Sequence, residues 1–419
     1  MHVHRASRSS SGVWRTVLVA GMASYLDAGA IIASGLVVGG FYADALNLNA
    51  AGTGLLLGAH TFAFATGAIA GGRAGDRLGR RRVLVASLVL YAAGVALLAS
   101  AWSVSSLALG LVISGLAIGA DLPTSLAMVG ESAPAGAKGR AIAFTQALWV
   151  VGIAATGLLG VLLADLGATA GRLIYLHLLV VAVVVLAFRM ELKESPEWAR
   201  EMQRLRNAAP TPTRGTGPLI RLDLLASATG LSAISLAVYY TAWNLGANTL
   251  GQFKTYLWIK AMDGTERGAA VLILLGIPVG LSLSVVFALL ADGRRRHRWI
   301  VSGALISTAG WLAVAIWPTP QGFIILVVCF AAGAPFSGET AFKLWTQQLL
   351  PTLHRAAVQG TALAVARVVA AAAAVFTPAV ALESPRSLFV TLFVLSALST
   401  AIATWWIPRL DRHHRPPAW

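Results

Sequence analysis

The chain has 419 residues, of which 57% are hydrophobic and 12% are charged. Soluble proteins carry about 25% charged residues, so this composition excludes an ordinary soluble protein and indicates one that lies in a membrane. The formal net charge is +15, but the basic residues sit in short clusters between apolar runs. We therefore expect a lipid bilayer around the chain and no nucleic-acid partner.

Apolar runs long enough to cross a bilayer follow one another along the chain, since a spanning helix needs about 20 mostly apolar residues. Six of them lie near residues 13–38, 51–72, 83–101, 104–130, 139–166 and 171–190. Six more lie near residues 222–250, 268–291, 299–317, 321–349, 356–381 and 387–407. The sequence therefore predicts an all-α membrane protein with twelve transmembrane helices, in two six-helix bundles of residues 1–190 and 222–419.

The polar segment 191–221 separates the two predicted bundles. It begins with helix-forming residues and ends in proline, threonine and glycine, which favours a short surface helix followed by a flexible linker. The N-terminus, the even-numbered loops and the C-terminus hold 25 of the 32 Lys and Arg residues. Because positive charge accumulates on the cytoplasmic side, we expect both termini in the cytoplasm and a multi-pass protein of the inner membrane.

The loop after the second run has a distinctive pattern of glycine and charge, formed by Gly72, Asp76, Arg77, Gly79 and Arg80. It resembles the signature loop of the major facilitator superfamily, G-x-x-x-D-R-x-G-R-R. A weaker copy, Asp292 with Arg296, follows the eighth run, where an internal repeat would place it. The resemblance implies a two-bundle transporter in which these charges form ion pairs that gate one mouth.

Three further segments are similar to motifs of the sugar porter family within that superfamily. Glu131-Ser132-Ala133-Pro134 with Arg140 resembles E-x-x-P-x-x-x-R-G, and Glu194-Ser195-Pro196-Glu197-Trp198 resembles P-E-S-P-R-W. Pro351 with Arg355 resembles P-x-x-x-R-x-x-x-x-G. The resemblance implies transport of a sugar, a polyol or an organic acid, and it assigns Glu131, Arg140 and Arg355 to gating.

Charged side chains near the membrane midplane cost about 2.5–3.5 kcal/mol on insertion scales, so each is a functional candidate. The predicted helices place five residues there: Asp27, Asp121, Glu339, Lys343 and Arg367. Glu339 and Lys343 are four residues apart, so they share a helix face and could form a structural ion pair. All five are candidates for proton coupling.

Asp27 matches a titrating aspartate of the first helix in proton-coupled sugar porters, but the position of its arginine partner in that family is Leu111 here. Asp121 lies in Gly-Ala-Asp-Leu-Pro, which is similar to the G-G-D-x-P of phosphate and organic-acid proton symporters. A carboxylate in apolar surroundings can exchange a proton near neutral pH. We expect proton coupling, with Asp27 as the first choice and Asp121 as the second.

The seventh run carries the most polar helix face. Tyr240, Trp243, Asn244, Asn248 and Gln252 recur at helical spacing, and amides both donate and accept hydrogen bonds, which suits a hydroxyl-rich ligand. Interhelical hydrogen bonding is the alternative interpretation. From other runs, Gln146, Trp149 and Gln347 are further candidates for substrate binding. His60 is interpreted as a packed residue or as a proton relay.

The predicted function is secondary transport by alternating access, with proton-coupled uptake of a sugar or a cyclic polyol such as inositol. The first alternative is a proton symporter of a small organic or aromatic acid. The second is an exporter of drugs or metabolites. Drug/proton antiporters of the superfamily that this chain resembles carry a Gly-Pro pair in the fifth helix, and its absence from the fifth run disfavours this alternative. No phosphate-binding G-x-x-x-x-G-K-[ST] occurs, so we expect no ATP-driven pump, and no His/Cys cluster occurs that would bind a metal. We expect no enzyme activity and no cofactor. We expect a monomer whose partners are a small polar substrate and protons.

Overall fold

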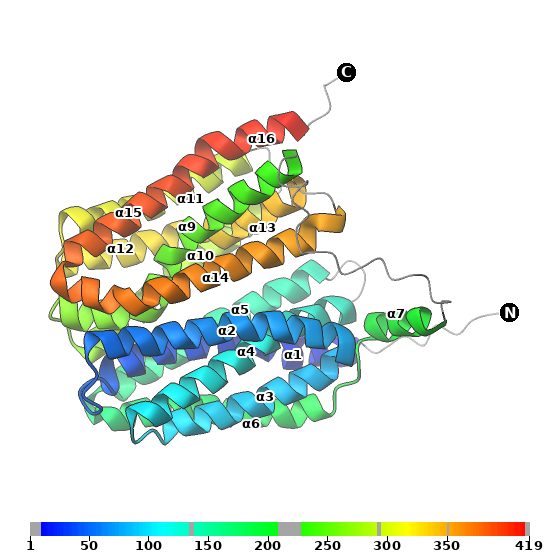
Figure 1. The fold of residues 1–419 in the computed structure, drawn as a ribbon, viewed down its shortest axis with the longest axis horizontal. Coiled ribbons are helices and arrows are strands. Elements are labelled where there is room, and N and C mark those ends of the chain that lie inside the picture. Colours follow the sequence, from blue (N-terminus) through cyan, green and yellow to red (C-terminus); the bar gives the residue numbers. More distant parts are fainter. Residues whose placement is uncertain (1–9, 134–137, 208–227, 291–294, 350–351, 415–419) are drawn as a thin grey trace. The chain divides into compact units, whose positions relative to one another are not determined.

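The computed structural model describes residues 10–133, 138–207, 228–290, 295–349 and 352–414, and within these ranges it contains helices and no strand. The first half holds α1 (Ser10–Leu36), α2 (Ala50–Leu78), α3 (Arg80–Ala99), α4 (Val104–Ser132), α5 (Lys138–Leu162), α6 (Ala168–Met190) and α7 (Pro196–Asn207). The second half holds α9 (Ala228–Tyr256), α10 (Glu266–Leu290), α11 (Arg296–Ile316), α12 (Pro320–Gly333), α13 (Gly338–Leu349), α14 (Thr352–Glu383), α15 (Pro385–Ala401) and α16 (Ile407–His414). Figure 1 shows their order along the chain.

Short non-α turns extend several of these helices. The π-helical turns η1 (Val37–Phe41), η3 (Leu257–Ala261) and η4 (Ile402–Trp406) follow α1, α9 and α15, and the 3₁₀ turn η2 (Ala164–Leu166) follows α5. Within the described residues, ten helical segments are long and apolar enough to span a bilayer, and α5 contributes the shorter apolar stretch Ala147–Leu162. The chain is therefore an all-helical, multi-pass membrane protein.

The run predicted at 321–349 is two helices rather than one. Helix α12 ends at Gly333 and α13 begins at Gly338. Pro335 lies between them and has no N–H to donate to a helix, and Gly338 has a φ of 68°, which favours glycine. The N–H of Gly338 donates to the Tyr239 hydroxyl of α9 at 2.8 Å. The break thus has a backbone partner from a neighbouring helix.

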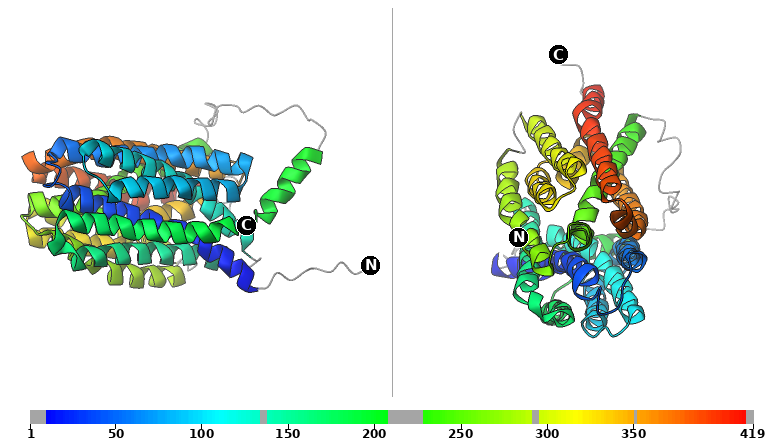
Figure 2. Two further views of the ribbon diagram at one scale, coloured as in Figure 1. Left: turned by 90° about the horizontal axis from the view of Figure 1, so that it is seen from below. Right: turned by 90° about the vertical axis from the view of Figure 1, so that its left-hand side faces the viewer.

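The chain packs as two compact units whose limits pass through α1, α2 and α5. Unit 1 comprises residues 1–33, 62–159 and 169–211, and unit 2 comprises residues 34–61, 160–168 and 212–419. The beginning of α2 and the ends of α1 and α5 therefore pack with the second half of the sequence. In unit 1, α7 is inclined to the long helices (Figure 2), and it matches the surface helix predicted in segment 191–221.

Glycines allow the helices of each unit to approach closely. In unit 1, a side chain at Gly67 or Gly71 of α2 would collide with the backbone of α4. In unit 2, Gly54 and Gly58 at the beginning of α2 face backbone carbonyls of α14 in the same way. Such contacts between small residues replace the hydrophobic driving force that lipid removes. They bring α2 close to α4 in unit 1 and to α14 in unit 2. Helix α14 in turn runs beside α9 (Figure 1).

Candidate functional site

One face of α9 carries a stripe of polar residues in unit 2. Tyr240, Asn244, Asn248 and Gln252 are each four residues apart, so they follow one another along the helix. The Asn244 amide donates to the Tyr240 hydroxyl at 3.4 Å, and that hydroxyl donates to the Glu339 carboxylate at 3.4 Å. Tyr240, Asn244 and Gln252 are buried, and Asn248 is half-buried. The stripe connects α9 with α13 through hydrogen bonds to a carboxylate.

The far end of this stripe contacts α2. The Gln252 amide donates to Thr61 Oγ1 at 2.7 Å, and Thr61 Oγ1 lies 2.9 Å from Gln252 Oε1. Both side chains are buried. Sequence reasoning selected Gln252 but not Thr61, because one threonine in an apolar, glycine-rich run carries no signal of its own.

Aromatic rings pack around the Tyr240 end of the stripe. The centroids of the Tyr240 and Phe342 rings lie 4.6 Å apart. The Trp243 indole stacks on Phe330 at 5.9 Å and lies against the backbone of Gly338. Because a side chain at Gly338 would collide with this indole, it is the glycine at the start of α13 that makes room for Trp243.

Three residues near the stripe carry buried polar atoms for which the described residues supply no hydrogen-bond partner. These atoms are Trp243 Nε1, Asn244 Oδ1 and both ring nitrogens of His60. An unsatisfied buried donor or acceptor costs roughly 1–3 kcal/mol. The indole N–H is a donor, the amide oxygen is an acceptor, and a neutral imidazole offers one of each. The unsatisfied set therefore contains both donors and acceptors.

Arg367 of α14 brings a positive charge to the same part of unit 2. Its charge acts on the His60 ring and on the Tyr240 hydroxyl, and the Glu339 carboxylate acts on that hydroxyl as well. Of the candidates selected from the sequence, Tyr240, Asn244, Glu339 and Arg367 are thus brought together. The backbones of Lys343 and Gln347 belong to α13, but their side chains are outside the described residues.

In unit 1, Asp27 of α1 is buried and contacts α5. The Trp149 indole donates to Asp27 Oδ2 at 3.2 Å. The sequence predicted Asp27 as a proton site and Trp149 as a substrate contact, and the fold brings the two together. Two residues before Asp27, the Tyr25 hydroxyl lies 2.7 Å from His177 Nε2 of α6. The side chain of the remaining α5 candidate, Gln146, is not described.

Asp121 of α4 forms a buried ion pair that sequence reasoning missed. Its two carboxylate oxygens accept from the Arg189 guanidinium of α6 at 2.5 and 2.9 Å. The Ser87 hydroxyl of α3 donates to the same carboxylate at 2.7 Å. Arg189 also donates to the Leu84 carbonyl at 2.9 Å. Arg189 is the second-last residue of the run 171–190, between Phe188 and Met190, and a single arginine at the end of an apolar run does not indicate its partner.

The signature loop forms a second charged cluster in unit 1. The Arg80 guanidinium pairs with Asp76 at 2.6 Å and with Glu131, near the end of α4, at 2.9 Å. The Glu194 carboxylate accepts from the backbone N–H groups of Arg80 at 2.9 Å and Arg81 at 3.2 Å. A carboxylate here satisfies free N–H groups and complements the positive end of α3. Gly79, with a φ of 101°, makes the turn.

The other predicted gating residues are less constrained or lie outside the description. Arg77 is exposed, and Arg296 is half-buried at the start of α11. Gly72 has open space where a side chain would lie. Asp292 and the side chains of Arg140 and Arg355 are outside the described residues.

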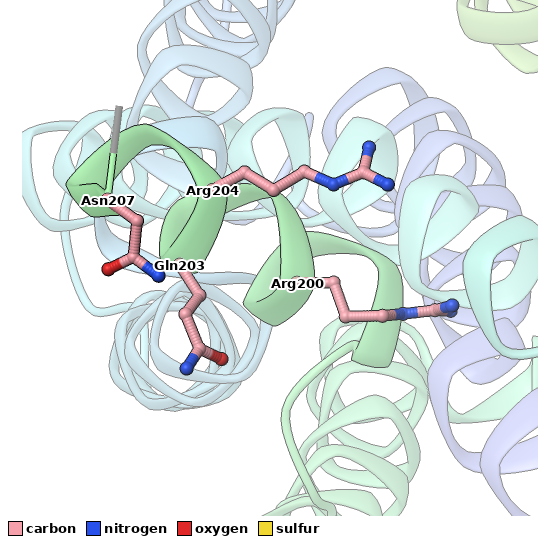
Figure 3. A pocket seen from close by; sticks show the side chains of 4 residues that line it. All are labelled: Arg200, Gln203, Arg204 and Asn207. Carbon is pink, nitrogen blue, oxygen red and sulfur yellow. The ribbon is translucent and has the colours of Figure 1, made fainter. Parts of the chain in front are cut away.

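A separate surface pocket lies on α7. It has a volume of about 480 Å³ and is lined by Arg200, Gln203, Arg204 and Asn207, whose side chains extend from one short helix (Figure 3). The Trp198 indole attaches α7 to the signature loop by donating to the Asp76 carbonyl at 2.8 Å. None of the residues selected from the sequence as proton-coupling or substrate-binding candidates lines this pocket.

The model of the Major Facilitator Superfamily matches residues 17–374 of the chain. The chain belongs to this superfamily. Its members are transporters and not enzymes, in agreement with the sequence. The match covers both halves of the chain and includes the signature loop, so the resemblance drawn from Gly72–Arg82 is confirmed.

Curated relatives and solved structures agree with this assignment. The chain is 28% identical to the minor myo-inositol transporter IolF of Bacillus subtilis over 369 residues, which cover 87% of this chain and 83% of the relative. It is 24% identical to the glucose transporter GlcP of Staphylococcus epidermidis over 387 residues, covering 86% and 82%. The inward-open xylose transporter XylE from E. coli superposes with a TM-score of 0.72 at 16% identity, covering 94% and 96%. This last likeness concerns the fold alone.

Proposed function

We propose that this chain takes up a neutral polyhydroxylated substrate, a sugar or an inositol-like cyclic polyol, by proton-coupled alternating access. The observation that carries the proposal is the mixed set of unsatisfied donors and acceptors beside the α9 stripe. A hydroxyl both donates and accepts, so a ligand with several hydroxyls can satisfy both Trp243 Nε1 and Asn244 Oδ1. The similarity to a myo-inositol and a glucose transporter supports the same class.

An acid substrate fits this part of unit 2 less well. An ionised carboxylate only accepts hydrogen bonds, so it would satisfy the Trp243 indole and leave Asn244 Oδ1 without a donor. Arg367 could attract an anion, but the Glu339 carboxylate acts on the same Tyr240 hydroxyl with the opposite charge. A polyol is therefore the better match.

For proton coupling we propose Asp27. Asp121 shares its carboxylate with Arg189 and Ser87 in a buried cluster, so both of its oxygens already have strong partners within unit 1. Asp27 instead accepts from the indole of Trp149, a predicted substrate contact. Proton binding at Asp27 would change this hydrogen bond, which gives the proton a direct means to alter the position of Trp149.

The topology that we propose has twelve spanning helices in the bundles 1–190 and 222–419, joined by the segment 191–221. Both termini and the signature loop would face the cytoplasm, because the loops on that side hold most of the arginines. In that orientation the cluster of Asp76, Arg80, Glu131 and Glu194 would stabilise the cytoplasmic mouth. Fusion of a reporter active only in the cytoplasm to each terminus tests this orientation.

The substrate class is tested with the purified full-length chain and a panel of ligands. Thermal stabilisation is measured with myo-inositol, hexoses, pentoses, benzoate and short carboxylic acids, because a ligand that binds the folded state raises its melting temperature. Uptake into proteoliposomes with an inward proton gradient then follows for each ligand that stabilises. We expect neutral polyols or sugars to stabilise and to accumulate. Stabilisation by acids alone would reject the proposal.

A further inference from the structure

His60 is buried with both ring nitrogens unsatisfied, and a role in packing alone does not explain this. It lies on α2 in unit 2, and 2% of its surface is exposed. Neither Nδ1 nor Nε2 has a hydrogen-bond partner within the described part of the chain. Buried polar side chains are normally hydrogen-bonded, and a residue whose role is only to fill space is normally apolar. The imidazole therefore keeps its hydrogen-bonding capacity for a group outside these residues.

The contacts of its neighbours place His60 beside the polar stripe of α9. Thr61, the next residue, is hydrogen-bonded to Gln252 at the far end of that stripe. The charge of Arg367 acts both on the His60 ring and on the Tyr240 hydroxyl at the other end. Gly58, two residues earlier, packs against the Ala371 carbonyl of α14, one helical turn beyond Arg367. His60 is thus held between α9 and α14, at the level of the residues proposed to bind substrate.

We propose that His60 binds a hydroxyl group of the transported polyol, as donor through one ring nitrogen and as acceptor through the other. This inference rests on the proposed function and adds to it a substrate-binding residue from α2. From the sequence alone, His60 is interpreted as a packed residue or as a proton relay. A hydroxyl can satisfy either nitrogen, and two neighbouring hydroxyls of a ring can satisfy both. His60 would then select for the position of a hydroxyl as well as its presence.

The test combines substitutions of His60 with removal of single hydroxyls from the ligand. The ligand is myo-inositol, or the sugar that stabilises the wild-type chain most, together with its monodeoxy analogues. In the wild-type chain we expect loss of the hydroxyl that contacts His60 to weaken binding about tenfold, or about 1.4 kcal/mol. In His60→Leu we expect the parent ligand to bind about tenfold more weakly, with no further loss for that one analogue. His60→Asn retains a donor and an acceptor and should recover part of the affinity.

A matched control is available on the same helix. Thr53 is buried on α2, seven residues before His60 and thus about 10 Å from it along the helix, and no described residue satisfies its hydroxyl. Thr53→Val therefore removes a comparable buried polar group at a distance from His60. We expect this variant to bind every analogue as the wild type does. Equal additional losses for all analogues in His60→Leu and His60→Asn would overturn the assignment of His60. If the wild-type chain bound no neutral polyol or sugar, the proposed function itself would fail.

Discussion

The Asp121 carboxylate and the Arg189 guanidinium form a bidentate ion pair in which 2% of one side chain and none of the other is exposed. The pair joins α4 to α6, and hydrogen bonds from Ser87 and to the Leu84 carbonyl extend it to α3. Two buried charges are costly unless each satisfies the other. The contribution of each residue of this cluster to stability therefore depends on the presence of the others, and single and double variants measure this dependence.

Replacing one partner of this pair should destabilise the chain strongly. We expect Asp121→Asn or Arg189→Gln to reduce stability by about 3–5 kcal/mol, because each leaves the other partner without its counterpart. The double variant Asp121→Leu/Arg189→Met should recover most of the loss, since no buried charge remains. Thermal unfolding in detergent measures the effect. Single variants as stable as the wild type would show that the pair contributes nothing.

Asp27→Asn should separate accumulation from exchange. An amide cannot release a proton, so we expect uphill uptake driven by a proton gradient to be lost, while exchange of substrate across the proteoliposome membrane continues. Trp149→Phe removes the indole N–H that donates to Asp27 and keeps the charge, so it should retain accumulation with an altered KM. Undiminished accumulation by Asp27→Asn would exclude Asp27 as the coupling residue.

Gly79 and Gly72 of the signature loop should respond differently to alanine. Gly79 has a φ of 101° and lies against the Glu194 carboxylate, and a non-glycine residue in such a conformation costs about 1–3 kcal/mol. Gly72 is within α2 and has open space around it, so alanine there should be neutral or stabilising by up to about 1 kcal/mol. Thermal unfolding of both variants measures the difference. Equal effects would contradict the role given to the turn.

Two exposed ion pairs in unit 2 join segments that are far apart in the sequence. Asp165 after α5 pairs with Arg267 of α10 at 2.5 Å, and Asp44 after α1 pairs with Lys260 at 3.6 Å. Exposed pairs contribute at most about 1 kcal/mol, so Arg267→Gln should change overall stability little. Gly40 of η1 is buried and lies beside Glu266, the residue before Arg267. If the segments joined by these pairs separate during transport, we expect Arg267→Gln to raise the labelling rate of a cysteine placed at Gly40 by up to about fivefold.

This labelling experiment starts from Cys329→Ser, which removes the single natural cysteine. The exchange Asp165→Arg/Arg267→Asp rebuilds the pair with reversed charges and should restore the original rate. A rate that stays high in the exchanged variant would attribute the effect to something other than the pair.

The helices could be predicted from the sequence because each needs only an apolar run of sufficient length. The superfamily could be predicted because the loop Gly72–Arg82 has a fixed spacing of glycine and charge. The partners of the buried charged and polar side chains could not be predicted. Arg189 is 68 residues from Asp121 and Thr61 is 191 residues from Gln252, and no local pattern relates such positions. The break after Gly333 was missed since hydrophobicity continues across it, although Pro335 and Gly338 were visible signals.

The separation of α13 from α12 has a mechanical consequence for the polar stripe. Glu339 is the residue after Gly338, so a change in the two backbone angles of that glycine swings the carboxylate while α12 stays in place. A continuous helix would have to break its own hydrogen bonds to do the same. Because the Gly338 N–H donates to the Tyr239 hydroxyl, this point of the chain stays attached to α9 while Glu339, the next residue, changes direction. Substitutions at residues 334–338 would therefore redirect the Glu339 carboxylate toward a substrate of different shape, without replacing any residue that contacts the substrate.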